Sequence, residues 1–165
     1  MTILLIICTS QCKAQNNNNI NDLVDALVDG YFYPSNDSIT NGSKFLEIWK
    51  ETIPYLIDAI STNKKGFLGF HDMLSSNINI GYTGQRSAYM IEYIISNSRN
   101  NIFNEGVIVK YIDKKMLHLS YEDMKEIKIL YKKWWNKNKH KTIEELSEDW
   151  HNNKRPLTGS VYKWK

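Results

Sequence analysis

The chain has 165 residues, of which 42% are hydrophobic and 24% charged, and its formal net charge is +3. These proportions are ordinary for a globular protein, and so small a net charge gives no reason to expect binding to nucleic acid or to an anionic membrane surface. The length is sufficient for one domain with a substantial hydrophobic core.

The N-terminal segment, residues 1–15, has the composition of an export signal. An apolar run over residues 3–8 is too short to span a bilayer, and small and polar residues follow it. Cleavage after Ala14 would remove both cysteines, Cys8 and Cys12, from the mature protein. We therefore expect a protein of the bacterial periplasm or outer envelope surface, without disulfide or thiol chemistry.

Lipidation at Cys12 is a second interpretation of this segment. The segment resembles bacterial lipoprotein signals, in which a cysteine follows the apolar core and begins the mature chain. However, no basic residue precedes Lys13, although export signals normally begin with one. An apolar N-terminal helix that packs on the domain is therefore the third interpretation.

The domain itself is expected to begin after an asparagine-rich tether. Residues 16–19 form this tether, and residues 20–165 form a single helical domain. Apolar residues recur at helical spacing over residues 20–28, which predicts a first helix that ends at Gly30.

Proline and glycine divide the helices that follow. Pro54 lies within a helical pattern that begins near Lys44, so it either kinks that helix or restarts it. Residues 61–81 contain several glycines and polar residues, and we expect mostly loop there. Thr83 precedes an apolar pattern that predicts a helix over residues 84–96.

The second half of the chain begins with residues 97–119, whose pattern allows two interpretations. Within it, residues 107–112 are rich in β-branched side chains and form either a short strand, for which no partner is apparent, or a buried helix. Two capping boxes then predict helices over residues 120–138 and 142–150.

The C-terminal tail contains a segment, residues 156–164, that is too apolar and aromatic to be a frayed end. We expect it to fold back on the helices and to bury Leu157, Tyr162 and Trp164. The complete pattern predicts a mainly all-α protein, a compact orthogonal or HEAT-like bundle of about five to six helices with an ordered aromatic tail.

Two segments resemble the helix pair of HEAT-like repeat proteins. Residues 53–60, IPYLIDAI, place a proline before a Leu-Ile pair, and residues 84–91, GQRSAYMI, are similar to the helix that usually follows. The resemblance implies an α-helical hairpin and a binding surface rather than an active site. The chain is also similar in overall character to small exported bacterial proteins and to immunity proteins that neutralise toxins.

Catalytic and metal-binding motifs are not apparent in the sequence. The four histidines, His71, His118, His140 and His151, lack the spacing of a helical zinc site, and neither a nucleophile elbow nor a P-loop occurs. We expect no metal and no cofactor. The alternative to a binding protein is a cell-envelope hydrolase, for which His71, Asp72 and a helix glutamate are the candidate catalytic residues.

The strongest candidate for partner binding is the aromatic and basic run at residues 131–135. Trp134 fits the buried stripe of its helix, whereas Trp135 points about a hundred degrees away, so it either packs on another element or contacts a partner. The candidate binding residues are Tyr131, Lys132, Lys133 and Trp135. We expect an exported, non-enzymatic interaction protein, of immunity or inhibitor type, whose partner is another protein and which has no transmembrane span.

Overall fold

The computed structural model describes residues 20–22, 24–25, 49–67, 80–96 and 106–165. The expected export segment, its two cysteines and the tether lie outside these residues. The elements in chain order are η1 (Trp49–Thr52), α3 (Ile53–Ala59), β1 (Lys65–Phe67), β2 (Ile80–Tyr82), α4 (Gly84–Ser96), β3 (Ile108–Ile112), β4 (Lys115–Leu117), α5 (Tyr121–Asn138), α6 (Ile143–His151) and β5 (Tyr162–Trp164).

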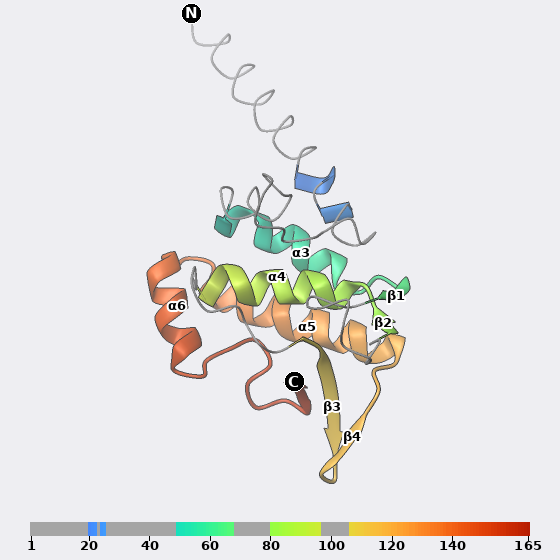
Figure 1. Ribbon diagram of the computed structural model, residues 1–165. Coiled ribbons are helices and arrows are strands. Elements are labelled where there is room, and N and C mark those ends of the chain that lie inside the picture. Colours follow the sequence, from blue (N-terminus) through green and yellow to red (C-terminus); the bar gives the residue numbers. More distant parts are fainter. Residues whose placement is uncertain (1–19, 23, 26–48, 68–79, 97–105) are drawn as a thin grey trace, which may run out of the picture.

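The helices form the body of the molecule, and a β-hairpin projects from it (Figure 1). Helix α3 packs against both α4 and α5, while α6 packs against α4. Strands β3 and β4 extend beyond the helices at the lower end of the view in Figure 1. Only the base of this hairpin therefore lies against the helical body.

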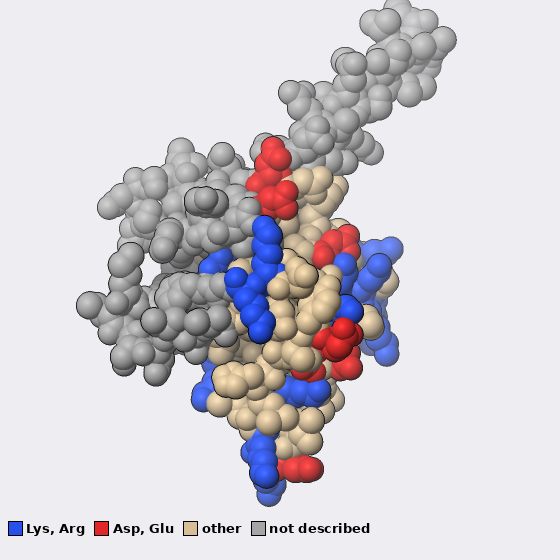
Figure 2. All heavy atoms as spheres, turned by 90° about the vertical axis from the view of Figure 1, so that its right-hand side faces the viewer, with Lys and Arg blue, Asp and Glu red and all other residues tan. Residues whose placement is uncertain are grey.

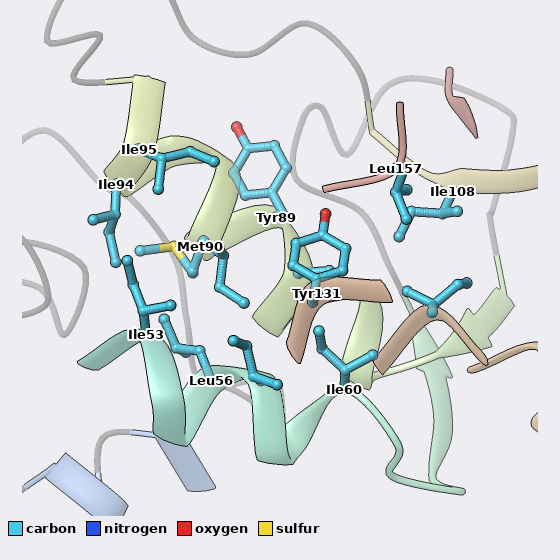
Figure 3. Packing of buried hydrophobic residues seen from close by; sticks show 14 of the residues in the cluster. Ile53, Leu56, Ile60, Tyr89, Met90, Ile94, Ile95, Ile108, Tyr131 and Leu157 are labelled. Atoms are coloured by element: carbon cyan, nitrogen blue, oxygen red, sulfur yellow. The ribbon is translucent and has the colours of Figure 1, made fainter. Parts of the chain in front are cut away.

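The hydrophobic core lies where α3, α4 and α5 meet. In Figure 3, Ile53 and Leu56 of α3 point toward Met90 of α4. Every residue of α4 except Tyr93 is buried. A helix buried on all sides carries its polar side chains into the interior, where each needs a hydrogen-bond partner. Gln85 illustrates this, because its Oε1 accepts a hydrogen bond of 2.8 Å from the backbone N–H of Ile108 in β3.

The expectation of an all-α fold, whether an orthogonal or a HEAT-like bundle, is wrong. The protein is α+β, with an antiparallel pair β1–β2 and an antiparallel sheet in the order β4-β3-β5. The β1–β2 pair falls within the segment expected to be mostly loop. Of the two interpretations of residues 107–112, the strand is correct, and β3 finds its partners in β4 and in the C-terminal tail.

Elements with local sequence signals agree with expectation. Helix α4 has the expected bounds, and both capping boxes are formed, by Ser120 with Asp123 and by Thr142 with Glu145. Helix α3 begins after a short 3-10 turn with a proline in its first turn, so the chain restarts a helix at this point. In the tail, Leu157 and Tyr162 are buried as expected, whereas Trp164 is half-buried. Residues 20–22 and 24–25 are helical, within the predicted first helix.

Candidate interaction surface

The β3–β4 hairpin is closed by a two-residue turn. Ile112 pairs with Lys115, and the two residues between them, Asp113 and Lys114, have φ angles of 49° and 64°. Two positive φ angles in succession define a type I′ turn, whose twist matches that of the flanking strands. The turn therefore continues the ribbon directly and gives a tight hairpin.

Exposed apolar side chains gather on this hairpin and on the residue before β5. Within the described part of the chain, five of the six exposed large hydrophobic side chains lie here. The sixth, Ile129, stands apart on α5. We call the five together the hairpin surface; they are Tyr111, Ile112, Met116, Leu117 and Val161. The strand pairing places Tyr111, Met116 and Val161 on one face of the sheet, and Ile112 and Leu117 on the other. Single exposed apolar residues are normal, but several of them gathered on one projecting element indicate a contact site.

Lysines border the hairpin surface. The side chains of four lysines are exposed along the hairpin and the last residues of the chain, namely Lys114, Lys115, Lys163 and Lys165. The acidic residue of this region is Asp113. Lys165 Nζ lies 3.7 Å from the Met116 sulfur, so basic and apolar groups adjoin directly. The lower end of Figure 2 shows basic and acidic side chains beside uncharged surface.

Asp123, near the N-terminus of α5, holds the base of the sheet. Its Oδ1 accepts hydrogen bonds from Lys110 Nζ at 2.6 Å and from the Tyr162 hydroxyl at 2.9 Å. Its Oδ2 accepts from the backbone N–H of Ser120 at 2.7 Å and from the Ser120 hydroxyl at 2.6 Å. Burial alone would raise the pKa of Asp123, but the hydrogen bonds from Lys110, Ser120 and Tyr162 outweigh it and leave the pKa below its usual range.

Tyr162 connects β5 to two carboxylates of α5. Its hydroxyl oxygen lies 2.9 Å from Asp123 Oδ1 and 2.5 Å from Glu126 Oε2. A hydroxyl has one proton, so it donates to one carboxylate at a time. Burial first, and then these carboxylates, raise the pKa of Tyr162. The tyrosine therefore stays neutral and keeps the proton that joins β5 to α5.

Glu92 of α4 forms a second attachment, deeper in the protein. Its side chain is fully buried, and Oε1 accepts a hydrogen bond of 2.7 Å from the Tyr131 hydroxyl and a longer one of 3.4 Å from Trp164 Nε1. Oε2 accepts a hydrogen bond of 2.6 Å from Trp150 Nε1. Burial raises the pKa of Glu92, although these donors and the charge of Arg155 act in the opposite direction.

The Glu92 cluster joins elements rather than presenting a reactive group. Its three donors belong to α5, α6 and β5, so one carboxylate connects four elements. The Arg155 guanidinium lies 3.8 Å from the Trp150 ring centroid. Glu92 is not among the residues that the sequence predicts to be functional. The available signal was a single acidic residue within an apolar helical pattern, because such a residue has to be satisfied in the interior.

The structure does not bring the four predicted binding residues together. Tyr131 is buried and bonds to Glu92, whereas Lys132 and Lys133 are exposed. Trp135 is half-buried beside Trp134, and Lys50 Nζ lies 5.9 Å from its ring centroid. Trp135 therefore packs against another part of the protein, which is one of the two alternatives that its position allows.

The other sequence candidates do not form a chemical site in the described part of the chain. His71, Asp72 and Cys12 lie outside it, and His118, His140 and His151 are exposed. Among the residues described, His, Cys, Asp and Glu side chains form no group of three that could hold a metal ion. The helices described there include none with the length and apolar character needed to cross a bilayer.

A scan against protein-family models finds no match, and searches of the curated proteins and of the solved structures find none either.

Proposed function

We propose that this protein is a non-enzymatic interaction protein of the bacterial envelope that binds another protein through the hairpin surface. The observation that carries the proposal is the concentration of exposed apolar side chains on one projecting element. Met116 is 48% exposed and Tyr111, its cross-strand neighbour, 37%. Burial of such apolar groups against a partner removes them from water and makes the free energy of binding more favourable.

The attachment of the hairpin to the helices supports the same proposal. Asp123 bonds Lys110 in β3 and Tyr162 in β5 to the start of α5, and Glu92 bonds Trp164 in β5 to α4. A binding element that is held in place before the partner arrives loses less conformational entropy on binding. The hydrogen bonds of Asp123 and Glu92 hold the base of the sheet that carries the hairpin surface in this way.

The envelope location and the immunity or inhibitor type are part of the proposal. The apolar segment at residues 3–8, followed by small and polar residues, supports export. The hydrogen bonds that hold the base of the sheet against the helices support an inhibitor type, because such a protein presents a preformed surface to its partner. The basic residues beside it favour a partner with an acidic face.

Site-specific photo-crosslinking in cells that produce the full chain tests this function. A photoreactive amino acid replaces Tyr111 in one variant and Ile129 in the control, because Ile129 is exposed to 64% but lies outside the hairpin surface. A third variant carries the group at Lys133, within the run that the sequence favours. We expect a discrete crosslinked product from position 111 and none from 129 or 133.

Competition establishes that the product reflects specific binding. Excess wild-type protein is expected to remove the crosslink, whereas excess protein with both Met116→Ser and Val161→Ser is not. A crosslink from position 133 alone would assign binding to the α5 surface instead. Equal crosslinks from 111 and 129 would contradict a specific hairpin surface.

A further inference from the structure

The backbone pairing of the three-stranded sheet shows which groups of β4 face outward. The backbone N–H of Tyr111 donates a hydrogen bond of 2.8 Å to the carbonyl oxygen of Val161, on the β5 side. In an antiparallel pair, opposite residues alternate between exchanging backbone hydrogen bonds and not exchanging them. Since Tyr111 is bonded toward β5, its partner Met116 is not bonded to β3. The N–H and C=O of Met116 therefore turn toward the free edge of β4.

This edge is accessible. In the part of the chain that the structure describes, β4 pairs only with β3 and ends the sheet. All three residues of β4, Lys115, Met116 and Leu117, have exposed side chains. A strand edge with outward N–H and C=O groups is a template onto which another extended chain can pair.

We infer that the free edge of β4 accepts an extended, acidic segment of a partner protein as an added strand. The inference rests on the proposed function and specifies the partner. Strand addition takes its affinity from main-chain hydrogen bonds, here with Met116, and its specificity from adjoining side chains. Those side chains are apolar on Met116 and Leu117 and basic on the bordering lysines.

The charges select the chemistry of the partner. Lys115 lies on β4 itself, Lys114 lies in the turn before it, and Lys165 Nζ lies 3.7 Å from the Met116 sulfur, whereas the acidic residue of the hairpin is Asp113. Lys163 lies on β5, on the other side of β3 from the free edge. Glutamate or aspartate in an added strand would lie near Lys115 and the Lys165 ammonium group, and opposite charges across neighbouring strands stabilise the pairing. Such a partner is expected to bind more weakly as salt screens the exposed charges.

The same observations disfavour two other occupants. A second copy paired edge to edge would bring identical lysines together across a two-fold axis. A lipid surface offers the N–H and C=O of Met116 no strand to pair with, and entry of the hairpin tip would carry Asp113 toward the acyl chains. An acidic protein segment satisfies both the backbone groups and the charges.

Amide chemical shifts of the isotope-labelled full chain, titrated with a defined probe, test the inference. The probe is a short peptide that alternates glutamate with valine, and the matched peptides carry lysine for glutamate or N-methyl groups on alternate amides. We expect saturable shifts at the Met116 and His118 amides with the acidic peptide. The lysine and N-methylated peptides are each expected to bind at least about fivefold more weakly.

A matched pair of variants separates the backbone contact from the side-chain contact. Met116→Pro removes the outward N–H without removing a bond to β3, and proline is tolerated at such edge positions. Met116→Ala shortens the side chain and keeps the N–H. Proline is expected to weaken acidic-peptide binding roughly fivefold more than alanine does. Unchanged Ile108 and Tyr162 amide shifts in both variants establish that the sheet is intact.

The outcomes distinguish this inference from the proposed function. A crosslink at position 111 that Met116→Pro and Met116→Ala reduce equally would overturn strand addition and leave the hairpin surface as the binding site. No shifts at Met116 and His118 with the acidic peptide would also overturn it. Flotation of the protein with vesicles of phosphatidylglycerol and phosphatidylethanolamine would assign the edge to lipid. A dimer in sedimentation that Met116→Pro abolishes would assign it to a second copy of the chain.

Discussion

The Tyr131 hydroxyl donates a hydrogen bond of 2.7 Å to Glu92 Oε1 in the interior of the protein, and both side chains are fully buried. A buried carboxylate is costly unless donors surround it, and Tyr131 is joined in this role by Trp150 and Trp164. The carboxylate of Glu92 thus accepts hydrogen bonds from side chains of α5, α6 and β5. The stability of the helical body and the position of β5 are therefore coupled through one side chain.

Glu92→Gln is expected to lower the free energy of unfolding by about 2 kcal/mol. The NH₂ group of glutamine replaces a carboxylate oxygen that accepts a hydrogen bond, and so it would face an N–H or O–H group that also donates. Urea unfolding at neutral pH measures the loss. The control is Glu148→Gln on α6, an exposed position where a change within about 0.5 kcal/mol is expected. Equal stability of the two variants would show that the cluster contributes little.

Asp123 is expected to make stability depend on pH in the acid range. Its folded pKa lies below its ordinary value of 3.8, so the unfolded state binds more protons than the folded state as the pH falls. The stabilisation from Asp123 is therefore complete above that ordinary pKa and is lost as the pH falls below it. Asp123→Asn removes the titrating group.

The stability difference between wild type and Asp123→Asn, measured by urea unfolding between about pH 2 and pH 6, isolates this effect from other carboxylates. We expect the difference to grow as the pH rises and to level off above the ordinary pKa of 3.8, within the upper part of this range. A difference independent of pH would mean that the contacts of Asp123 with Lys110 and Tyr162 are not formed in solution.

The close approach of α3 and α4 requires glycine at position 84. A Cβ atom there would lie 2.2 Å from the carbonyl oxygen of Ile60 and 2.9 Å from that of Ala59. Both are backbone atoms, which cannot rotate away, so Gly84→Ala is expected to cost about 3 kcal/mol. Gly106→Ala is the control, since a Cβ there meets nothing within 4 Å. Thermal unfolding of the two variants compares them, and similar melting temperatures would contradict the packing.

Local signals account for what the sequence predicts correctly. The bounds of α4 and the starts of α5 and α6 follow from apolar spacing and from capping residues such as Ser120 and Thr142, which lie within a few residues of the helices they begin. Strand β3 could not be decided, because β5 comes from the end of the chain. No sequence window that contains β3 alone includes this partner.

The candidate surface was missed for two physical reasons. The turn at Asp113 and Lys114 lacks the Asn-Gly or Asp-Gly pair that usually announces a type I′ hairpin, so β4 was not recognised. Successive side chains of a strand also point to opposite faces, so the exposure of Tyr111 and Met116 can be predicted only when the strand register is known. Tyr131 is among the predicted binding residues because it begins the aromatic and basic run at residues 131–135, but its hydroxyl has a partner inside the core.

Lys114→Gly is expected to stabilise the hairpin. Lys114 has a φ of 64°, a conformation that costs an L-residue about 1–2 kcal/mol and glycine almost nothing. The greater freedom of glycine in the unfolded chain offsets part of this, so the expected net gain is below about 1 kcal/mol. Lys115→Gly is the matched control, because it removes the same charge from the next residue but lies within β4, where glycine weakens a strand. In urea unfolding, the free energy of unfolding of Lys114→Gly should therefore be higher than that of wild type, and that of Lys115→Gly should be lower. The reverse order would show that the turn is not of type I′ in solution.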